Sequence, residues 1–91
     1  MERSLNRVLV EGVVTVGFSE LTEAMFIIRG KSEGEDMTLR IRVSSEMRSS
    51  MMEKIKVGQT VRLVGHLVPA GENRVSIMAE CIEIVPVGTG G

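Results

Sequence analysis

The spacing of apolar residues changes once along this chain of 91 residues, and that change limits the folds open to it. Most of the chain alternates apolar and polar residues, as in MTLRIRV at 37–43, and this period of two is typical of a half-buried β-strand. In SSEMRSSMMEKIK at 44–56, apolar residues instead recur every four positions, at Met47, Met51 and Ile55. The pattern therefore predicts one short helix within a chain made mainly of strands.

The residues around segment 44–56 fit the ends of a helix. Ser44 or Ser45 can act as the N-cap by accepting a hydrogen bond from the first turn, and Gly58 can end the helix. Met52 lies off the apolar stripe and is expected to be exposed, whereas the stripe itself is expected to cover one end of the core.

Five segments are predicted to be strands, and polar connections separate two pairs of them. The strand segments are 5–17, 24–30, 37–43, 60–68 and 74–85. The connections KSEGED at 31–36 and PAGEN at 69–73 each predict a hairpin. Alternation within the strands places Met37 and Leu67 on inward faces.

Two of these strands contain an irregularity of the kind that closes a small barrel. Gly12 interrupts the first strand and predicts a bend, and a change of parity between Ile77 and Ile82 predicts a β-bulge near 79–81. Three strands, a helix and two more strands follow the order of the OB-fold. We therefore predict an all-β, five-stranded OB-fold barrel with one short helix between strands 3 and 4. An α+β sandwich, in which a sheet packs on one helix, is the alternative, although it explains neither bend.

The chain length fits one domain, which we place at residues 1–86, followed by a flexible tail at 87–91. Cys81 is the only cysteine, which excludes an internal disulfide, and we expect its side chain to be buried. His66 is the only histidine, so we expect no structural metal site, and we expect no cofactor. The apolar runs are too short for a membrane helix, and a cytoplasmic protein with no membrane partner is expected.

Charge and motif content narrow the classes of function. Eleven Lys and Arg oppose twelve Asp and Glu, and the resulting net charge of −1 excludes a polycation that coats nucleic acid by charge alone. The sequence contains no Ser-His-Asp or Cys-His arrangement and no phosphate-binding loop, so we do not expect an enzyme.

Three stretches resemble a known family in the order and spacing of their residues. NRVLVEG at 6–12 resembles the opening strand of bacterial single-stranded DNA-binding proteins, and VGQTVRLVGHL at 57–67 is similar to that family's fourth strand. AECIEI at 79–84 is similar to the end of the primosomal replication protein N branch. The resemblance implies an OB-fold homo-oligomer that binds single-stranded DNA and works with other proteins in replication, repair or recombination.

Arginine side chains are the candidates for contacts with such a strand. Eight of the eleven basic residues are Arg, whose guanidinium group clamps phosphates and stacks on bases. Arg40 and Arg42 share the outward face of the third predicted strand, within the ligand face of an OB-fold. The candidate nucleic-acid-binding residues are Arg7, Arg29, Arg40, Arg42 and Arg62.

Other interpretations of these residues stay open. The arginines can form an ordinary solvated face, paired with Glu11, Glu80 or Glu83. Tyr and Trp are absent, Phe occurs twice, and the connection at 31–36 holds three acidic residues. The domain can therefore also be an OB-fold module that assembles with other proteins and binds little or no nucleic acid. RNA is the alternative to single-stranded DNA as ligand.

A chain of this length gains stability by covering an exposed strand edge. The first predicted strand is the candidate edge, with Leu5, Leu9 and Val13 on its second face. We therefore expect a homodimer or a larger homo-oligomer.

Overall fold

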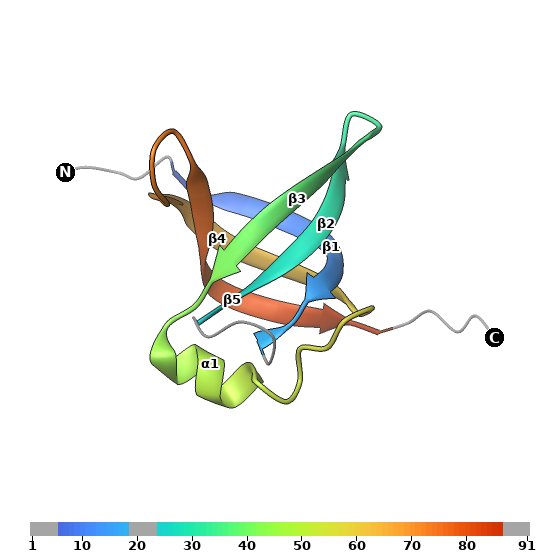
Figure 1. The fold of residues 1–91 in the computed structure, drawn as a ribbon. Coiled ribbons are helices and arrows are strands. Elements are labelled where there is room, and N and C mark those ends of the chain that lie inside the picture. Colours follow the sequence, from blue (N-terminus) through green and yellow to red (C-terminus); the bar gives the residue numbers. More distant parts are fainter. Residues whose placement is uncertain (1–5, 19–23, 87–91) are drawn as a thin grey trace.

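Five strands and one helix follow one another in the predicted order (Figure 1). The computed structural model describes residues 6–18 and 24–86. The elements are β1 (Val8–Val16), β2 (Met25–Ser32), β3 (Glu35–Arg42), α1 (Ser45–Met51), β4 (Thr60–Pro69) and β5 (Val75–Val85). Leu5, which was expected to begin the first strand, and the expected tail at 87–91 lie outside the described residues.

The strands close into a barrel in the order β1-β2-β3-β5-β4, which confirms the predicted OB-fold. All neighbouring strands are antiparallel except β3 and β5, which pair in parallel at Ile41 with Ile77 and at Arg42 with Met78. Helix α1 connects β3 to β4 and lies at one end of the barrel (Figure 1). The α+β sandwich is wrong, because the sheet returns on itself instead of presenting an open face to the helix.

Strand β1 pairs first with β4 and then with β2, and two glycines allow this exchange of partners. A Cβ on Gly12 would lie 2.7 Å from the carbonyl oxygen of Arg29, and a Cβ on Gly30 would lie 2.8 Å from the carbonyl oxygen of Glu11. The two backbones cross closer than any side chain permits. The irregularity predicted at Gly12 is therefore a close strand crossing, and a bulge follows it at Thr15.

Strand β5 contains the second predicted irregularity, a bulge at Glu80. Val64 pairs with Cys81 while Gly65 pairs with Ala79, so Glu80 is the extra residue on β5. The bulge shifts the phase of the strand and turns the Cys81 side chain outward. Cys81 is exposed, and the expectation of a buried thiol is wrong.

Helix α1 begins at a predicted cap and ends earlier than predicted. The Ser44 hydroxyl accepts a hydrogen bond from the Met47 N–H at 3.1 Å, which confirms Ser44 as the N-cap. The amides of Lys54 and Ile55 both donate to the Met51 carbonyl at 2.9 Å, and this tightened turn returns the chain to the core. In the part of the chain that the structure describes, no helix has the length and hydrophobicity that crossing a bilayer requires.

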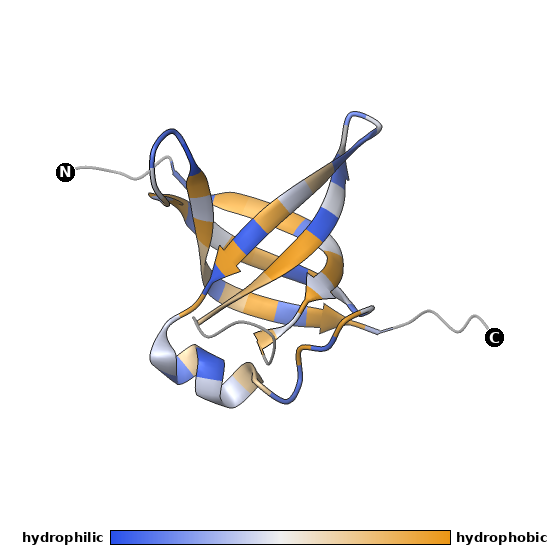
Figure 2. Ribbon diagram, in the orientation of Figure 1, coloured by the Kyte–Doolittle hydropathy of each residue, from blue (hydrophilic) through white to orange (hydrophobic). Residues whose placement is uncertain are grey.

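The core fills the barrel, and two hairpins project beyond it as arms, β2–β3 and β4–β5 (Figure 2). Phe18 and Phe26 meet edge to face in the core, with ring centroids 5.2 Å apart. Met37 and Leu67 were expected to face inward, yet their side chains are 42% and 41% exposed. Alternation assigns both side chains to the inner face of the sheet, but they lie on the arms, which extend beyond the core.

The bulge in β5 leaves no space for a side chain at Gly65, and this can be tested. A Cβ at this position would collide with the carbonyl oxygen of Met78, so we expect Gly65→Ala to lower the free energy of unfolding by about 1–3 kcal/mol. Gly17→Ala is the matched control, because among the described residues its Cβ would meet just the carbonyl oxygen of Ile55, at 3.8 Å. The control should change stability by about 1 kcal/mol or less. Urea denaturation measures both variants, and equal midpoints would contradict the proposed collision.

Candidate nucleic-acid interface

The outer face of β2 and β3 carries three of the five predicted arginines. The cross-strand pairs on this face are Met25 with Arg42, Ile27 with Arg40, and Arg29 with Thr38. Phe26, Ile28 and Ile41 take the alternate positions and point into the core. Alternation therefore leaves Arg29, Arg40 and Arg42 exposed on one surface, as the sequence predicted for Arg40 and Arg42.

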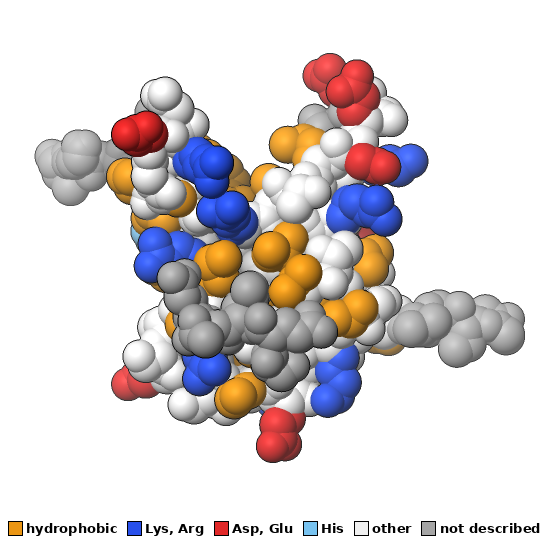
Figure 3. Space-filling view, viewed as in Figure 1, with side chains coloured by type: hydrophobic (Ala, Val, Ile, Leu, Met, Phe, Trp, Pro, Cys, Tyr) orange, Lys and Arg blue, Asp and Glu red, His pale blue; other side chains and the backbone are white. Residues whose placement is uncertain are grey.

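A groove opens where β3 and β5 separate beyond their two residue pairs. Two adjoining hollows of about 400 and 440 Å³ share Arg40 and Ser76, and Arg74 lines the first while Arg42 lines the second. Figure 3 shows Lys and Arg side chains gathered beside the β4–β5 arm, on the left of the view. The groove thus brings together Arg40, Arg42 and Arg74.

Arg74 is a candidate that the sequence interpretation missed. It follows the connection at 69–73 and comes directly before β5, far along the chain from β3. Its place beside Arg40 depends on the closure of the barrel and on no neighbour in sequence. The sequence could have indicated Arg74 through the strand order of the OB-fold, in which the fifth strand lies next to the third.

Four arginines on this side of the molecule have no ion-pair partner among residues 6–18 and 24–86. They are Arg29, Arg40, Arg42 and Arg74. The chain's only aromatic residues, Phe18 and Phe26, are both buried, so neither ring can stack on a base. Half-buried Met25 and Ile27 instead provide apolar surface directly across from Arg42 and Arg40.

The other two predicted arginines lie on the face formed by β1, β4 and β5, where carboxylates surround them. Arg62 contacts Glu11 at 3.4 Å and Glu83 at 3.8 Å, from strands on either side of it. Arg7 contacts Glu80 at 2.9 Å. On this face, the arginines thus form an ordinary solvated surface in which their charges are paired with glutamates, which is the alternative stated for them above.

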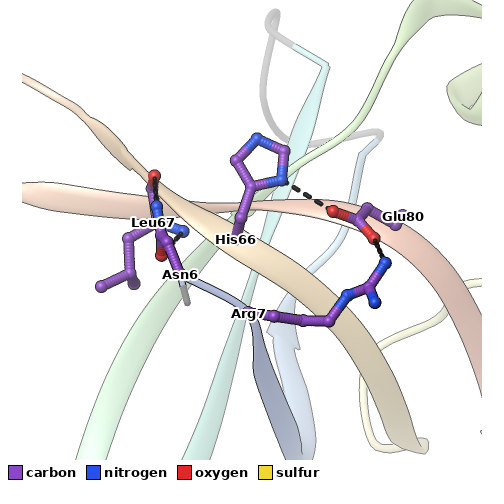
Figure 4. A network of polar contacts seen from close by, with 5 residues as sticks. All are labelled: Asn6, Arg7, His66, Leu67 and Glu80. Carbon is purple, nitrogen blue, oxygen red and sulfur yellow. Dashed lines mark hydrogen bonds and ion pairs between the residues drawn. The ribbon is translucent and has the colours of Figure 1, made fainter. Parts of the chain in front are cut away.

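Glu80 is the centre of a polar network beside the bulge (Figure 4). Its two carboxylate oxygens contact Arg7 Nη2 and His66 Nδ1, each at 2.9 Å. The hydrogen bonds from His66 and from Arg7 lower the pKa of Glu80, in that order of size. Next to this network, the Asn6 side chain donates to the Leu67 carbonyl at 3.0 Å and accepts from the Leu67 N–H at 2.9 Å. Together these contacts fasten the chain before β1 to strands β4 and β5.

An apolar cleft lies between the two arms (Figure 3). Its apolar lining residues are Val8, Leu9, Val10, Met37, Leu39, Leu67 and Ile77. The last three, Leu39, Leu67 and Ile77, also line the first hollow of the arginine groove, so cleft and groove are continuous. No group of three or more His, Cys, Asp or Glu side chains in the described residues is arranged to hold a metal ion.

The lowered pKa of Glu80 predicts a loss of stability in acid. A carboxylate whose pKa is lower in the folded state stabilises the fold above its unfolded pKa, about 4.3, and this contribution disappears as the pH falls through the folded value. Glu80→Gln should therefore make the free energy of unfolding less dependent on pH below about pH 4.5. Glu53→Gln is the control, since Glu53 is exposed and has no ion-pair partner among the described residues. Parallel stability curves for wild type and Glu80→Gln would refute the coupling.

Comparison with known proteins supports the fold. No protein-family model matches the chain, and no curated protein matches its sequence. Among solved structures, the mitochondrial single-stranded DNA-binding protein Rim1 of S. cerevisiae is 17% identical, with a TM-score of 0.75 over 93% of this chain and 98% of its own. The N-terminal domain of PriB from Thermoanaerobacter tencongensis, a dimeric structure, is 22% identical, with a TM-score of 0.67 over 92% and 100%. The SSB domain of a Synechococcus protein is 11% identical, with a TM-score of 0.72 over 90% and 98%. At these identities the likeness shows the fold, and the chain is an OB-fold domain of the form found in these three structures.

Proposed function

We propose that this protein binds single-stranded DNA in the groove formed by Arg40, Arg42 and Arg74, with Arg29 beside it on the same face. The observation that carries the proposal is the difference between two sets of arginines. Those around the groove have no ion-pair partner in the described part of the chain, whereas Arg7 and Arg62 are each paired with glutamate. Unpaired guanidinium groups along a groove are suited to a backbone of phosphates.

The mechanism rests on electrostatics with support from apolar contacts. Each guanidinium group can clamp a phosphate through two hydrogen bonds or lie flat on a base. Met25 and Ile27 can pack against base faces between the arginines, although sulfur and aliphatic carbon stack less well than an aromatic ring. We therefore expect binding with weak base preference and strong dependence on salt.

The structural neighbours support this ligand class, because two of those described above are named single-stranded DNA-binding or SSB-domain structures. We place the activity of this protein in replication, repair or recombination, in the cytoplasm. RNA remains the competing ligand, and a matched pair of DNA and RNA oligonucleotides distinguishes the two.

Removing the groove arginines should weaken binding without unfolding the protein. The variant Arg40→Ala/Arg42→Ala/Arg74→Ala loses three phosphate contacts. The negative slope of log affinity against log salt should therefore become smaller in magnitude by about 2.1, at roughly 0.7 per contact. A titration with fluorescent oligothymidine at several salt concentrations measures this slope. Circular dichroism checks that the fold is retained.

Arg7→Ala/Arg62→Ala is the matched control, because its arginines are exposed but already paired. It should leave the salt slope unchanged. Lysine at the three groove positions should restore binding only in part if bidentate and stacking contacts matter, and almost fully if charge alone matters. A triple alanine variant that binds like wild type would contradict the groove mechanism.

We further propose a homodimer formed through the first half of β1. Residues 8–10 pair with β4 on one side, whereas β2 pairs with β1 only from Val13 onward. The other side of residues 8–10 is therefore a strand edge with no partner strand among the described residues. Leu9, on the outer face of this segment, is 67% exposed. A second β1 strand would cover the edge and extend the sheet.

Sedimentation tests the dimer directly. The wild type should sediment as a dimer at micromolar concentration, and Leu9→Glu should shift it toward monomer, because the new charge would be buried in the interface. Thr15→Glu, on β1 beyond the unpaired edge, is the matched control and should leave the dimer intact. A wild type that sediments as a monomer would overturn the proposal, and a dimer insensitive to Leu9→Glu would place the contact elsewhere.

A second candidate function is favoured by the apolar cleft between the arms. Met37, Leu39 and Leu67 leave apolar surface there that a protein partner could cover, as expected of an OB-fold assembly module. This candidate predicts no measurable oligonucleotide affinity of the wild type at low salt. The same titration therefore decides between the two functions.

A further inference from the structure

We propose that the acidic tip of the β2–β3 arm ends the path of the nucleic acid, so that a bound strand runs past Arg42 and Arg40 toward the β4–β5 arm and leaves the β2–β3 arm bare. The inference rests on the proposed function and adds to it where the strand runs and how long its footprint is. Figure 3 shows the asymmetry on which it depends: Asp and Glu gather at the tip of the right arm, whereas the connection at the tip of the left arm has a single acidic residue, Glu72, with Lys and Arg side chains below it.

The outer face of β3 contains a gradient of charge. Successive outward residues from the tip to the barrel are Asp36, Thr38, Arg40 and Arg42. At a rise of about 3.3 Å per residue, Asp36 lies roughly 20 Å from Arg42 along the strand. A phosphate backbone that follows β3 outward from Arg42 therefore goes from attraction to repulsion within the length of one strand.

The tip itself is net negative. It contains Glu33, Glu35 and Asp36 against one cation, Lys31, which gives a net charge of −2, and these four residues are exposed. Lys31 is the cross-strand partner of Asp36, so the one cation of the tip lies beside a carboxylate. Screening over about 8 Å at physiological salt confines the repulsion to the arm and leaves Arg40 and Arg42 unaffected.

The two hollows on either side of the β2–β3 arm also differ in the charges that line them. On the outer side, a hollow is lined by Arg29 and Lys31 together with Glu11 and Asp36, so its two cations face two carboxylates. On the groove side, Arg40 and Arg74 line a hollow to which none of the described acidic residues contributes. Of the two, only the second hollow has described cations and no described carboxylate in its lining, and it leads away from the tip.

The test measures affinity as a function of oligonucleotide length. The variant Glu35→Gln/Asp36→Asn removes two charges from β3 without changing side-chain size, and Glu46→Gln/Glu53→Gln removes two charges at the helix end of the barrel. Both are titrated with oligothymidines of about 4 to 16 nucleotides, the range of site sizes for one OB-fold. Wild type and control should stop gaining affinity near the short end of that range.

The arm variant should continue to gain affinity with length, and it should bind the longest oligonucleotide about fivefold more tightly than wild type at low salt. Near 1 M salt, where the Debye length is about 3 Å, this difference should disappear. If wild type binds and the arm variant shows the same length dependence of affinity, this inference alone is overturned. An equal gain of affinity in the control variant would overturn it as well. Absence of binding by wild type would overturn the proposed function and this inference with it.

Discussion

The parallel contact between β3 and β5 is the constraint on which the rest of the molecule depends. It joins Ile41 to Ile77 and Arg42 to Met78, whereas β4 and β5 pair at ten positions. Because this seam is short, the barrel closes around its core while the two hairpins diverge above it. A longer seam would pair the outer part of β3 with β5, and the groove, the cleft and the separate arms would not exist.

Cross-strand register explains why some arginines are paired and others are not. Arg62 lies in register with Glu11 on one side and Glu83 on the other, so its charge is compensated by its neighbours. Arg40 and Arg42 lie in register with Ile27 and Met25, which have no charge to offer. The same fold therefore produces an internally compensated face and a face whose positive charge is directed outward.

Much of the fold could be predicted from local sequence patterns, because local patterns decide which residues face inward. The period change at 44–56 indicated the helix, Ser44 indicated its cap, and the parity change before Ile82 indicated the bulge at Glu80. The outward placement of Arg40 followed from alternation in the same way.

Features that depend on the closed barrel were not predictable from local patterns. Arg74 reaches the groove only because β5 returns beside β3. Met37 and Leu67 have inward parity, but the core does not extend to the arms on which they lie. The bulge was predicted, yet its effect on Cys81 depends on which residue is the extra one, and parity alone does not specify that residue.

The outward position of Cys81 has a chemical consequence of its own. It is the only sulfhydryl in the sequence and it is exposed, so a reagent that reacts with thiols can reach it at one position alone. It lies across from Val64 on the paired strands β4 and β5 and lines neither hollow of the arginine groove. A thiol-reactive label at Cys81 would thus mark the molecule at a single position and leave the arginine groove open.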